Sequence, residues 1–182
     1  MADAELVLKF QGGRADAFED LVRRHMKDAF AFCVRLTGDA AEAEELSQDG
    51  FVNAYRHLPE FRGDSSFRSW LFRILINLFR DRVRRREREE RRLDEVHRDA
   101  ERRQDLQGAG GEGEVNAGEL SDVVRRRVQD LPDRQREVLI LHVYQGLGYP
   151  EIASTLGCSY DDVKVNLSLA RKRLKKDLEA YW

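Results

Sequence analysis

The side chains best suited to chemistry in this sequence follow a short polar turn that ends at Ser159. From there to Leu174, apolar residues recur at helical spacing and leave a second face opposite them. The second face holds valine, leucine, serine and lysine, which can meet thymine methyl groups, base edges and phosphates in a DNA groove. The residues that we expect to contact DNA from this helix are Tyr160, Asp161, Lys164, Val165, Ser168, Leu169, Arg171 and Lys172.

The surrounding segment, 146–174, has the form of a helix-turn-helix. Pro150 is tolerated in the opening turn of a first helix, and Gly157 ends that helix. Ser159 is placed to cap the second helix, with Asp162 completing a capping box. A two-helix piece of an ordinary core is the alternative, but the turn, the cap and the basic run at 171–176 together favour DNA binding. We expect the second helix to bury Val163, Leu167, Ala170 and Leu174.

A second group able to bind nucleic acid begins at Phe61, where aromatic and basic residues interleave. Rings and cations in this mixture suit unstacked bases and their phosphates. The same rings could instead fill a small helical core, and the segment alone supports both interpretations about equally. The arginine-rich continuation of the same predicted helix, at 80–92, favours nucleic acid. The interleaved residues are Phe61, Arg62, Phe67, Arg68, Trp70, Phe72 and Arg73, with Asn77 one turn further.

Charge is strongly segregated, although the formal net charge is only -2. Residues 39–49 carry five acidic side chains and no basic one, whereas residues 80–92 carry eight arginines. Such blocks are often just solvated faces. Within one domain, opposite blocks predict two partners of opposite charge.

Helices must position these side chains, because helix formers dominate the sequence and it contains only 3 prolines. We expect an all-α fold of two small helical domains, at 1–92 and 119–182, joined by a flexible linker at 93–118. The linker loses the apolar period and becomes rich in glycine and glutamate, which cannot bury enough surface to order itself. In the helix from about Ala15, the predicted apolar side comprises Phe18, Leu21, Val22, Met26, Phe30, Cys33 and Val34.

Several kinds of function find no support in the sequence. No nucleophile lies beside a plausible base and no glycine-rich phosphate loop follows a strand, so we expect no enzyme and no cofactor. The histidines are scattered, which predicts no metal site. Cys33 and Cys158 are expected to be packed thiols, with a redox role as the alternative. With no apolar run long enough to span a membrane and no cleavable signal, we expect a cytoplasmic protein that does not insert into membranes.

Taken together, these patterns resemble the extracytoplasmic-function (ECF) sigma factors of the sigma-70 family, which bring bacterial RNA polymerase to promoters. The resemblance covers nearly the full chain, and its block at 61–77 is highly specific. It implies two helical domains, sigma-2 and sigma-4, joined by a linker. The motifs that carry it are AFEDLVRRH at 17–25, AEELSQDGFVNAYR at 43–56, FRGDSSFRSWLFRILIN at 61–77 and LPDRQREVL at 131–139.

The resemblance also implies roles for particular residues. Sigma-2 would capture a flipped base of the −10 element, and the helix-turn-helix would read the −35 element. The implied partners are the clamp helices and flap of core RNA polymerase, promoter DNA and an anti-sigma factor. The implied polymerase-facing residues are Glu45, Gln48, Asp49, Val52 and Asn53. The implied −10 residues are Phe61, Arg62, Gly63, Asp64, Ser65, Ser66, Phe67, Trp70, Arg73, Asn77 and Arg80.

The sequence departs from the family pattern at the start of the second helix of the helix-turn-helix. Asp161 and Asp162 replace a pair of small residues, and Asn166 replaces an arginine, so we expect an unusual −35 sequence. Gly50 stands where alanine or valine is common in the family, and this difference puts none of the implied residue roles in doubt. Two other functions stay open: a sigma-like mimic that sequesters an anti-sigma factor without binding promoters, and a two-domain repressor that works without polymerase.

Overall fold

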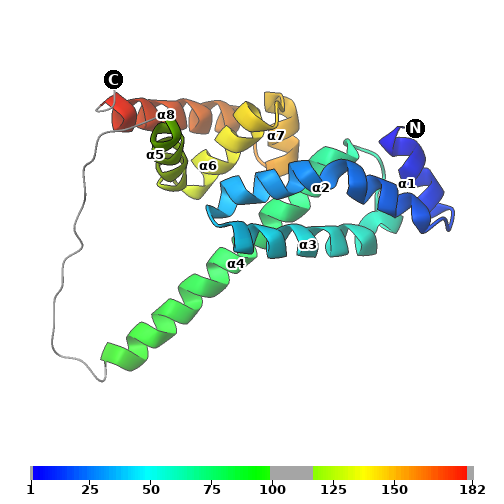
Figure 1. Cartoon of the computed structure of the whole chain (residues 1–182), viewed down its shortest axis with the longest axis horizontal. Helices are drawn as coiled ribbons and strands as arrows, with labels where there is room; N and C mark the ends of the chain where they lie inside the picture. The colour runs from blue at the N-terminus through cyan, green and yellow to red at the C-terminus, as the bar shows by residue number, and fades with distance from the viewer. Residues whose placement is uncertain (1, 99–116, 180–182) are drawn as a thin grey trace.

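The computed structural model describes residues 2–98 and 117–179, with side chains described for 2–92 and 123–179 (Figure 1). Every regular element in these residues is helical, which confirms the expected all-α class. In chain order the elements are α1 (Asp3–Gln11), α2 (Asp16–Thr37), α3 (Ala40–His57), the 3-10 turn η1 (Leu58–Glu60), α4 (Phe67–Arg98), α5 (Ala117–Gln129), α6 (Asp133–Leu139), the π turn η2 (Ile140–Tyr144), α7 (Tyr149–Leu156) and α8 (Tyr160–Leu178).

The N-terminal domain packs α2, α3 and the first half of α4 around a shared core. Phe32 of α2 and Phe72 of α4 are buried with their ring centroids 4.6 Å apart. Gly50 allows α3 and α4 to approach closely, since a Cβ there would lie 2.3 Å from Cδ2 of Leu75. A side chain at position 50 would therefore force Leu75 to move.

One expectation about this domain is wrong. Met26 and Phe30 were expected on the buried side of α2, but they are 55% and 37% exposed. The expected Phe18, Leu21 and Cys33 are buried, and the buried stripe also includes Ala29 and Phe32, which were not predicted. The apolar pattern of α2 is wide enough to cover more than one face, and only the positions of α3 and α4 decide which part is buried.

The C-terminal domain consists of α5 to α8 and contains the expected helix-turn-helix in α7 and α8. Val163, Leu167 and Ala170 are buried and Leu174 is partly buried, which confirms the predicted inner face of α8. Gly157 adopts a left-handed conformation, with φ of 61°, and ends α7 as expected. The continuation of α6 as the π turn η2 was not anticipated.

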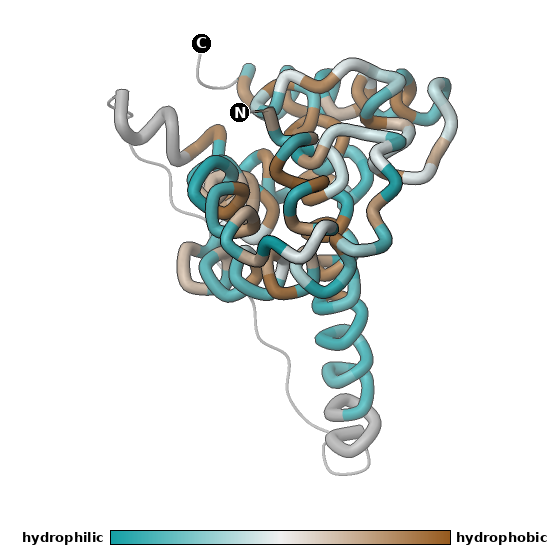
Figure 2. The backbone as a smooth tube through the Cα atoms, turned by 90° about the vertical axis from the view of Figure 1, so that its right-hand side faces the viewer, coloured by the Kyte–Doolittle hydropathy of each residue, from teal (hydrophilic) through white to brown (hydrophobic). Residues whose placement is uncertain are grey.

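The predicted linker is helical at both ends. Helix α4 continues to Arg98 and α5 begins at Ala117, while 99–116 lie outside the described residues. After Val83, α4 projects away from the rest of the molecule, and its residues 84–92 are strongly hydrophilic (Figure 2). A helix without an apolar face persists there because arginine and glutamate are good helix formers and pair along the helix, as Arg91 does with Glu87.

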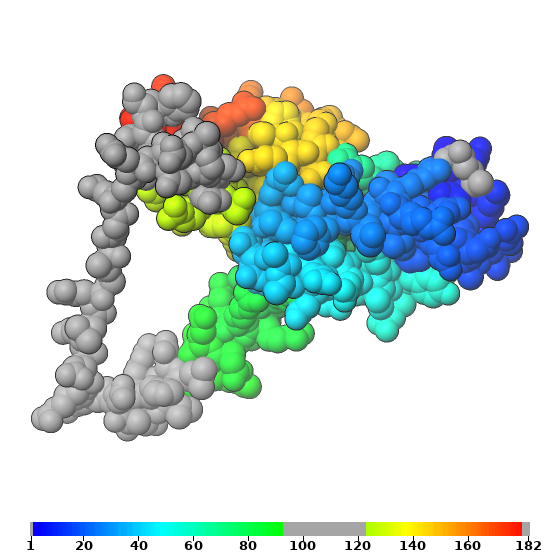
Figure 3. All heavy atoms as spheres, in the orientation of Figure 1, coloured from blue at the N-terminus to red at the C-terminus, as the bar shows by residue number. Residues whose placement is uncertain are grey.

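The two domains pack against each other. Helix α4 contacts α7, and α2 contacts both α5 and η2. In the space-filling view, residues of η2 lie directly on α2 (Figure 3). The sequence predicted two domains with their own cores, whereas buried side chains of both domains join in one continuous cluster.

Candidate nucleic-acid interface

The start of α8 is fixed by the capping box that the sequence predicts. Ser159 Oγ accepts a hydrogen bond from the Asp162 backbone N at 3.1 Å, and Asp162 Oδ2 accepts from the Ser159 backbone N at 3.0 Å. The Ser159 hydroxyl also donates to Asp162 Oδ2 at 2.7 Å. These bonds, with the hydroxyl contributing most, lower the pKa of Asp162 because they favour its charged form. The aspartate therefore stabilises the helix end.

The outer face of α8 is open along its length. Val165 is 55% exposed and Leu169 is 44% exposed, although both are apolar. All eight residues expected to contact DNA from this helix are exposed. Asn166 differs from them, since its amide donates to the backbone O of Asp162 at 2.8 Å and is turned onto its own helix. The surface thus combines apolar contact area with lysine and arginine side chains, a mixture suited to a major groove.

The loop before α4 is held by two contacts that sequence reasoning missed. Gln11 Nε2 of α1 donates to the backbone O of Leu58 at 3.0 Å and of Phe61 at 2.8 Å. Ser66 Oγ accepts from the Ser69 backbone N at 3.1 Å and caps the start of α4. The cap could have been found from a serine three residues before Ser69, but the Gln11 contact spans about fifty residues and leaves no local signal.

The aromatic residues of this segment divide between the two interpretations. Phe67 and Phe72 are 3% and 1% exposed, so they belong to the core, and the placement of Phe67 among base-contacting residues is not supported by its position. Phe61 and Trp70 are half-buried and their ring centroids lie 4.8 Å apart. The remaining members of the expected set are exposed or half-buried, namely Arg62, Gly63, Asp64, Ser65, Ser66, Arg73, Asn77 and Arg80.

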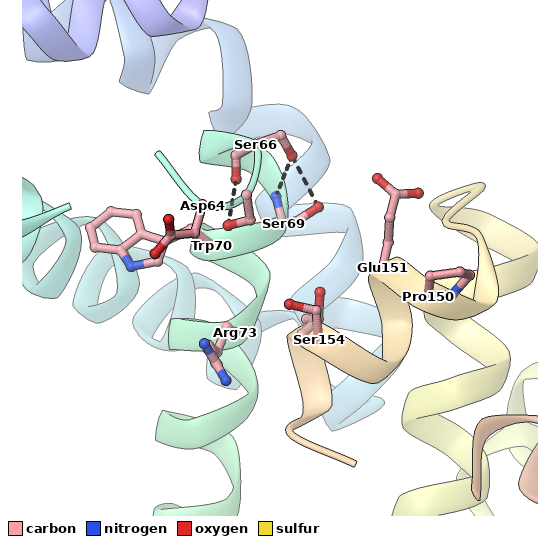
Figure 4. Close-up of a pocket in the computed structure, with 10 residues that line it drawn as sticks. Asp64, Ser66, Ser69, Trp70, Arg73, Pro150, Glu151 and Ser154 are labelled. Carbon is pink, nitrogen blue, oxygen red and sulfur yellow. Dashed lines mark hydrogen bonds between the residues drawn. The ribbon is translucent and has the colours of Figure 1, made fainter. Parts of the chain in front are cut away.

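A cleft of ≈ 330 Å³ lies between this segment and α7 (Figure 4). Trp70 and Arg73 of α4 line one side, and Glu151, Ser154 and Thr155 of α7 line the other. Its charged lining residues are one cation, Arg73, and two carboxylates, Asp64 and Glu151.

The polymerase-facing residues expected on α3 form one exposed face of that helix. Gln48 and Val52 are exposed, as are Glu45 and Asp49, while Asn53 is half-buried and donates to the backbone O of Asp49 at 2.9 Å. The face therefore offers carboxylates around an apolar side chain that is 47% exposed. Such a surface suits a basic protein partner.

The acidic and arginine-rich blocks partly neutralise each other. Arg82 Nη2 lies 2.5 Å from Asp49 Oδ2, and Arg86 Nη2 lies 2.6 Å from Glu42 Oε1. The prediction of two wholly separate charged surfaces is therefore wrong at these positions. The reason is tertiary, because α3 and α4 run side by side and bring the blocks together.

Sequence families of known proteins match both domains of the chain. Residues 21–89 match Sigma-70 region 2, and residues 121–174 match Sigma-70, region 4. The RNA polymerase sigma-H factor of Pseudomonas aeruginosa is 33% identical over an alignment that covers 97% of this chain and 94% of that protein. The ECF RNA polymerase sigma factor SigW of Bacillus subtilis is 31% identical and is covered over 91% of each chain. The chain belongs to the ECF sigma factors of the sigma-70 family.

The sigma factor also resembles a solved structure over both domains. The sigma factor RpoE from Bartonella quintana, solved in complex with the anti-sigma factor NepR, shares 26% identity. The superposition has a TM-score of 0.71 and covers 89% of this chain and 96% of that one. The match to region 2 thus falls on α2 to α4, and the match to region 4 falls on α5 to α8.

In this arrangement of the sigma factor, Arg80 is not open to DNA. Its guanidinium forms two hydrogen bonds to the carboxylate of Glu137, at 2.7 and 2.5 Å, across the domain interface. The Glu137 side chain is only 1% exposed. The paired hydrogen bonds to Glu137 raise the pKa of Arg80, because they favour its charged form.

The two cysteines of the sigma factor are free thiols, Cys33 buried and Cys158 half-buried. Burial raises the pKa of Cys33 to about 12, and it also raises the pKa of Cys158. Both shifts favour the protonated, less reactive thiol. Among the described side chains, no group of three potential ligands could hold a metal ion, and none of the described helices is long and apolar enough to cross a membrane.

Proposed function

We propose that this sigma factor reads a promoter with two separate surfaces, one on each domain. The outer face of α8 would read the −35 element in the major groove. The observation that carries this proposal is the exposure of Val165 and Leu169 on a helix whose opposite face is fully packed. Packing these side chains against thymine methyl groups would lower the free energy, because it removes apolar surface from water. Lys172 and Arg171, exposed beside them, would bind phosphates.

The second surface comprises the 61–66 loop and the exposed side of α4. Arg73 and Asn77 are exposed one turn apart on that side, next to the half-buried Trp70. We propose that this surface captures a base extruded from the −10 element. Extrusion costs a few kcal/mol of stacking and pairing, which ring stacking and edge hydrogen bonds must offset. DNA melting would therefore be coupled to recognition.

The acidic face of α3 would bind the clamp helices of core RNA polymerase, and the C-terminal domain would bind its flap. The support is the exposed group of carboxylates around Val52. The sigma factor itself would be no enzyme, because the polymerase supplies all the chemistry of RNA synthesis. This function would place the protein in the cytoplasm with the polymerase.

We also propose that an anti-sigma factor controls this protein. The support is the similarity to the Bartonella quintana sigma factor, which was solved with the anti-sigma factor NepR bound.

Transcription in vitro with purified core polymerase tests the proposed function. We expect the sigma factor to bind core and to support initiation from a defined promoter position. Core binding without any promoter-dependent initiation would instead favour a sigma-like mimic. Tight duplex binding by the free chain, without any need for polymerase, would favour a repressor.

A further inference from the structure

Helix α1 contacts the short turn η1, directly before the 61–66 loop. The last residue of α1, Gln11, donates from Nε2 to two backbone carbonyls, that of Leu58 at 3.0 Å and that of Phe61 at 2.8 Å. The Leu58 carbonyl also accepts from the Phe61 backbone N at 3.2 Å. Because the last carbonyl groups of a helix have no partner within it, they need one from elsewhere. One side-chain amide of α1 therefore closes the end of η1 and fixes the backbone at Phe61.

Helix α1 itself is anchored by apolar packing. Leu6 and Val7 are 1% and 5% exposed. The Phe10 ring centroid lies 5.7 Å from that of Phe18 on α2 and 5.1 Å from that of Tyr55 on α3. The helix would thus keep its place without the terminal amide, and loss of that amide would act on the loop.

The far end of the 61–66 loop is also linked to α1. Asp3 Oδ2 lies 2.7 Å from His25 Nε2, and the His25 ring centroid lies 5.1 Å from that of Phe67, the first residue of α4. Phe67 is 3% exposed, so this end is held in the core. Helix α1 therefore supports one end of the loop directly and the other through His25.

Between these ends the loop has little support from other elements. Gly63 has a φ of 78°, and a Cβ there would meet nothing within 4 Å. Among the described residues, no hydrogen bond or ion pair joins 62–65 to another element. The conformation of the loop thus depends on how its ends are held. At its start, the half-buried Phe61 ring lies 4.8 Å from that of Trp70.

We propose that Gln11 is a positioning residue for base capture, which keeps the Phe61 and Trp70 rings in the arrangement that receives the extruded base. The proposal rests on the assignment of the 61–66 loop and α4 to the −10 element. Gln11 acts through the backbone of the loop and does not touch DNA. Without its hydrogen bonds, fewer molecules have both rings in place, and the apparent affinity for the base falls with that fraction.

The first test reads the loop without DNA or polymerase. The chain contains two tryptophans, so Trp182→Phe leaves Trp70 as the only one. In that background, Gln11→Met keeps the length of the side chain and removes its N–H donors. Acrylamide quenching of Trp70 should rise about twofold, because two hydrogen bonds that hold the Phe61 ring beside it are lost. The control, Leu8→Ala, truncates a 68% exposed side chain of the same helix and should leave the quenching unchanged.

The second test measures base capture with core polymerase. The template is a promoter that the wild type selects from a randomised pool, and permanganate reactivity of its −10 thymines reports melting. Gln11→Met should form about tenfold less open complex than the wild type, because fewer molecules have the rings in place. Its affinity for core polymerase and its preference at the −35 bases should equal those of the wild type, which a general loss of folding would not allow.

Unchanged Trp70 quenching in the Gln11→Met protein would overturn the anchor. Raised quenching with wild-type melting would overturn its role in base capture. If the methionine variant does not fold, Gln11→Glu repeats both tests, since its ionised carboxylate has the same shape and no N–H donor. Because quenching involves neither DNA nor polymerase, failure of the anchor is distinguishable from a wild type that melts no promoter, which would refute the proposed function.

Discussion

Asn77 is the polar side chain of α4 best placed to act on a base, because it is exposed one turn after Arg73. We expect Asn77→Ala to impair promoter melting and to leave the affinity for core polymerase unchanged. Permanganate footprinting of the open complex would measure melting, and a core-binding titration would serve as the control. An equal loss in both assays would show that Asn77 is structural.

Val165 lies on the outer face of α8, the face that we propose enters the major groove, and it is 55% exposed. Val165→Ala should cost about 1 kcal/mol or more at one position of the −35 element and little elsewhere. Promoter affinities measured base by base would show this. Val143→Ala is a matched control, since Val143 is also 55% exposed but lies on η2. An unchanged preference at every −35 base would refute the contact.

For individual residues, patterns along one helix predicted caps and exposure correctly, whereas contacts between residues far apart in the sequence could not be predicted. The Ser159 cap and the exposure of Val165 follow from spacing along one helix, and both are present. The burial of Phe67 and the pairing of Arg80 with Glu137 could not be predicted, because they depend on residues from other helices. An arginine run is therefore a poor guide to which individual arginine reaches phosphate.

Helix α3 carries the polymerase-facing surface, and its exposed apolar centre offers a direct test. Val52→Arg places a cation among carboxylates that are expected to meet a basic surface, so core affinity should fall about tenfold or more. Leu8→Arg makes the same kind of change at a 68% exposed leucine of α1 and should leave core affinity unaltered. If the two variants bound core polymerase with comparable affinity, the polymerase interface would not lie on α3.

The close approach of α3 and α4 predicts a cost for any side chain at position 50. Gly50→Ala should lower the free energy of unfolding by about 1–3 kcal/mol, because the new methyl group must displace the buried Leu75. Urea denaturation monitored by circular dichroism would measure it. Gly148→Ala is the control, since its Cβ would meet nothing nearer than 3.6 Å. Equal stabilities for the two variants would mean that Leu75 repacks freely.

The identity of the helices was predictable from the sequence, but not every helix end was. The helix-turn-helix stands where proline, glycine and serine signals place it, with α7 ending before Gly157 and α8 beginning after Ser159. Helix α4 instead continues to Arg98, past the point where its apolar period stops. Charge pairing and helix propensity keep it helical without burial, so the loss of an apolar face does not mark its end.

At the scale of the whole molecule, two domains were predictable but their contact was not. Composition separates the domains because the intervening segment is rich in glycine and charge. Nothing in the sequence pairs Arg68 with Gln145, which lie 77 positions apart. The relative position of the two domains follows only from the structure.

We propose that one chain reads two separated promoter elements, the −10 element with α4 and the −35 element with α8. A run-off transcription selection with core polymerase and a randomised promoter tests it most directly. We expect two short enriched elements at a fixed spacing, with Val165→Ala altering only the upstream element and Asn77→Ala affecting only the downstream one. Enrichment of a single element, or changes in both elements from either substitution, would contradict the account.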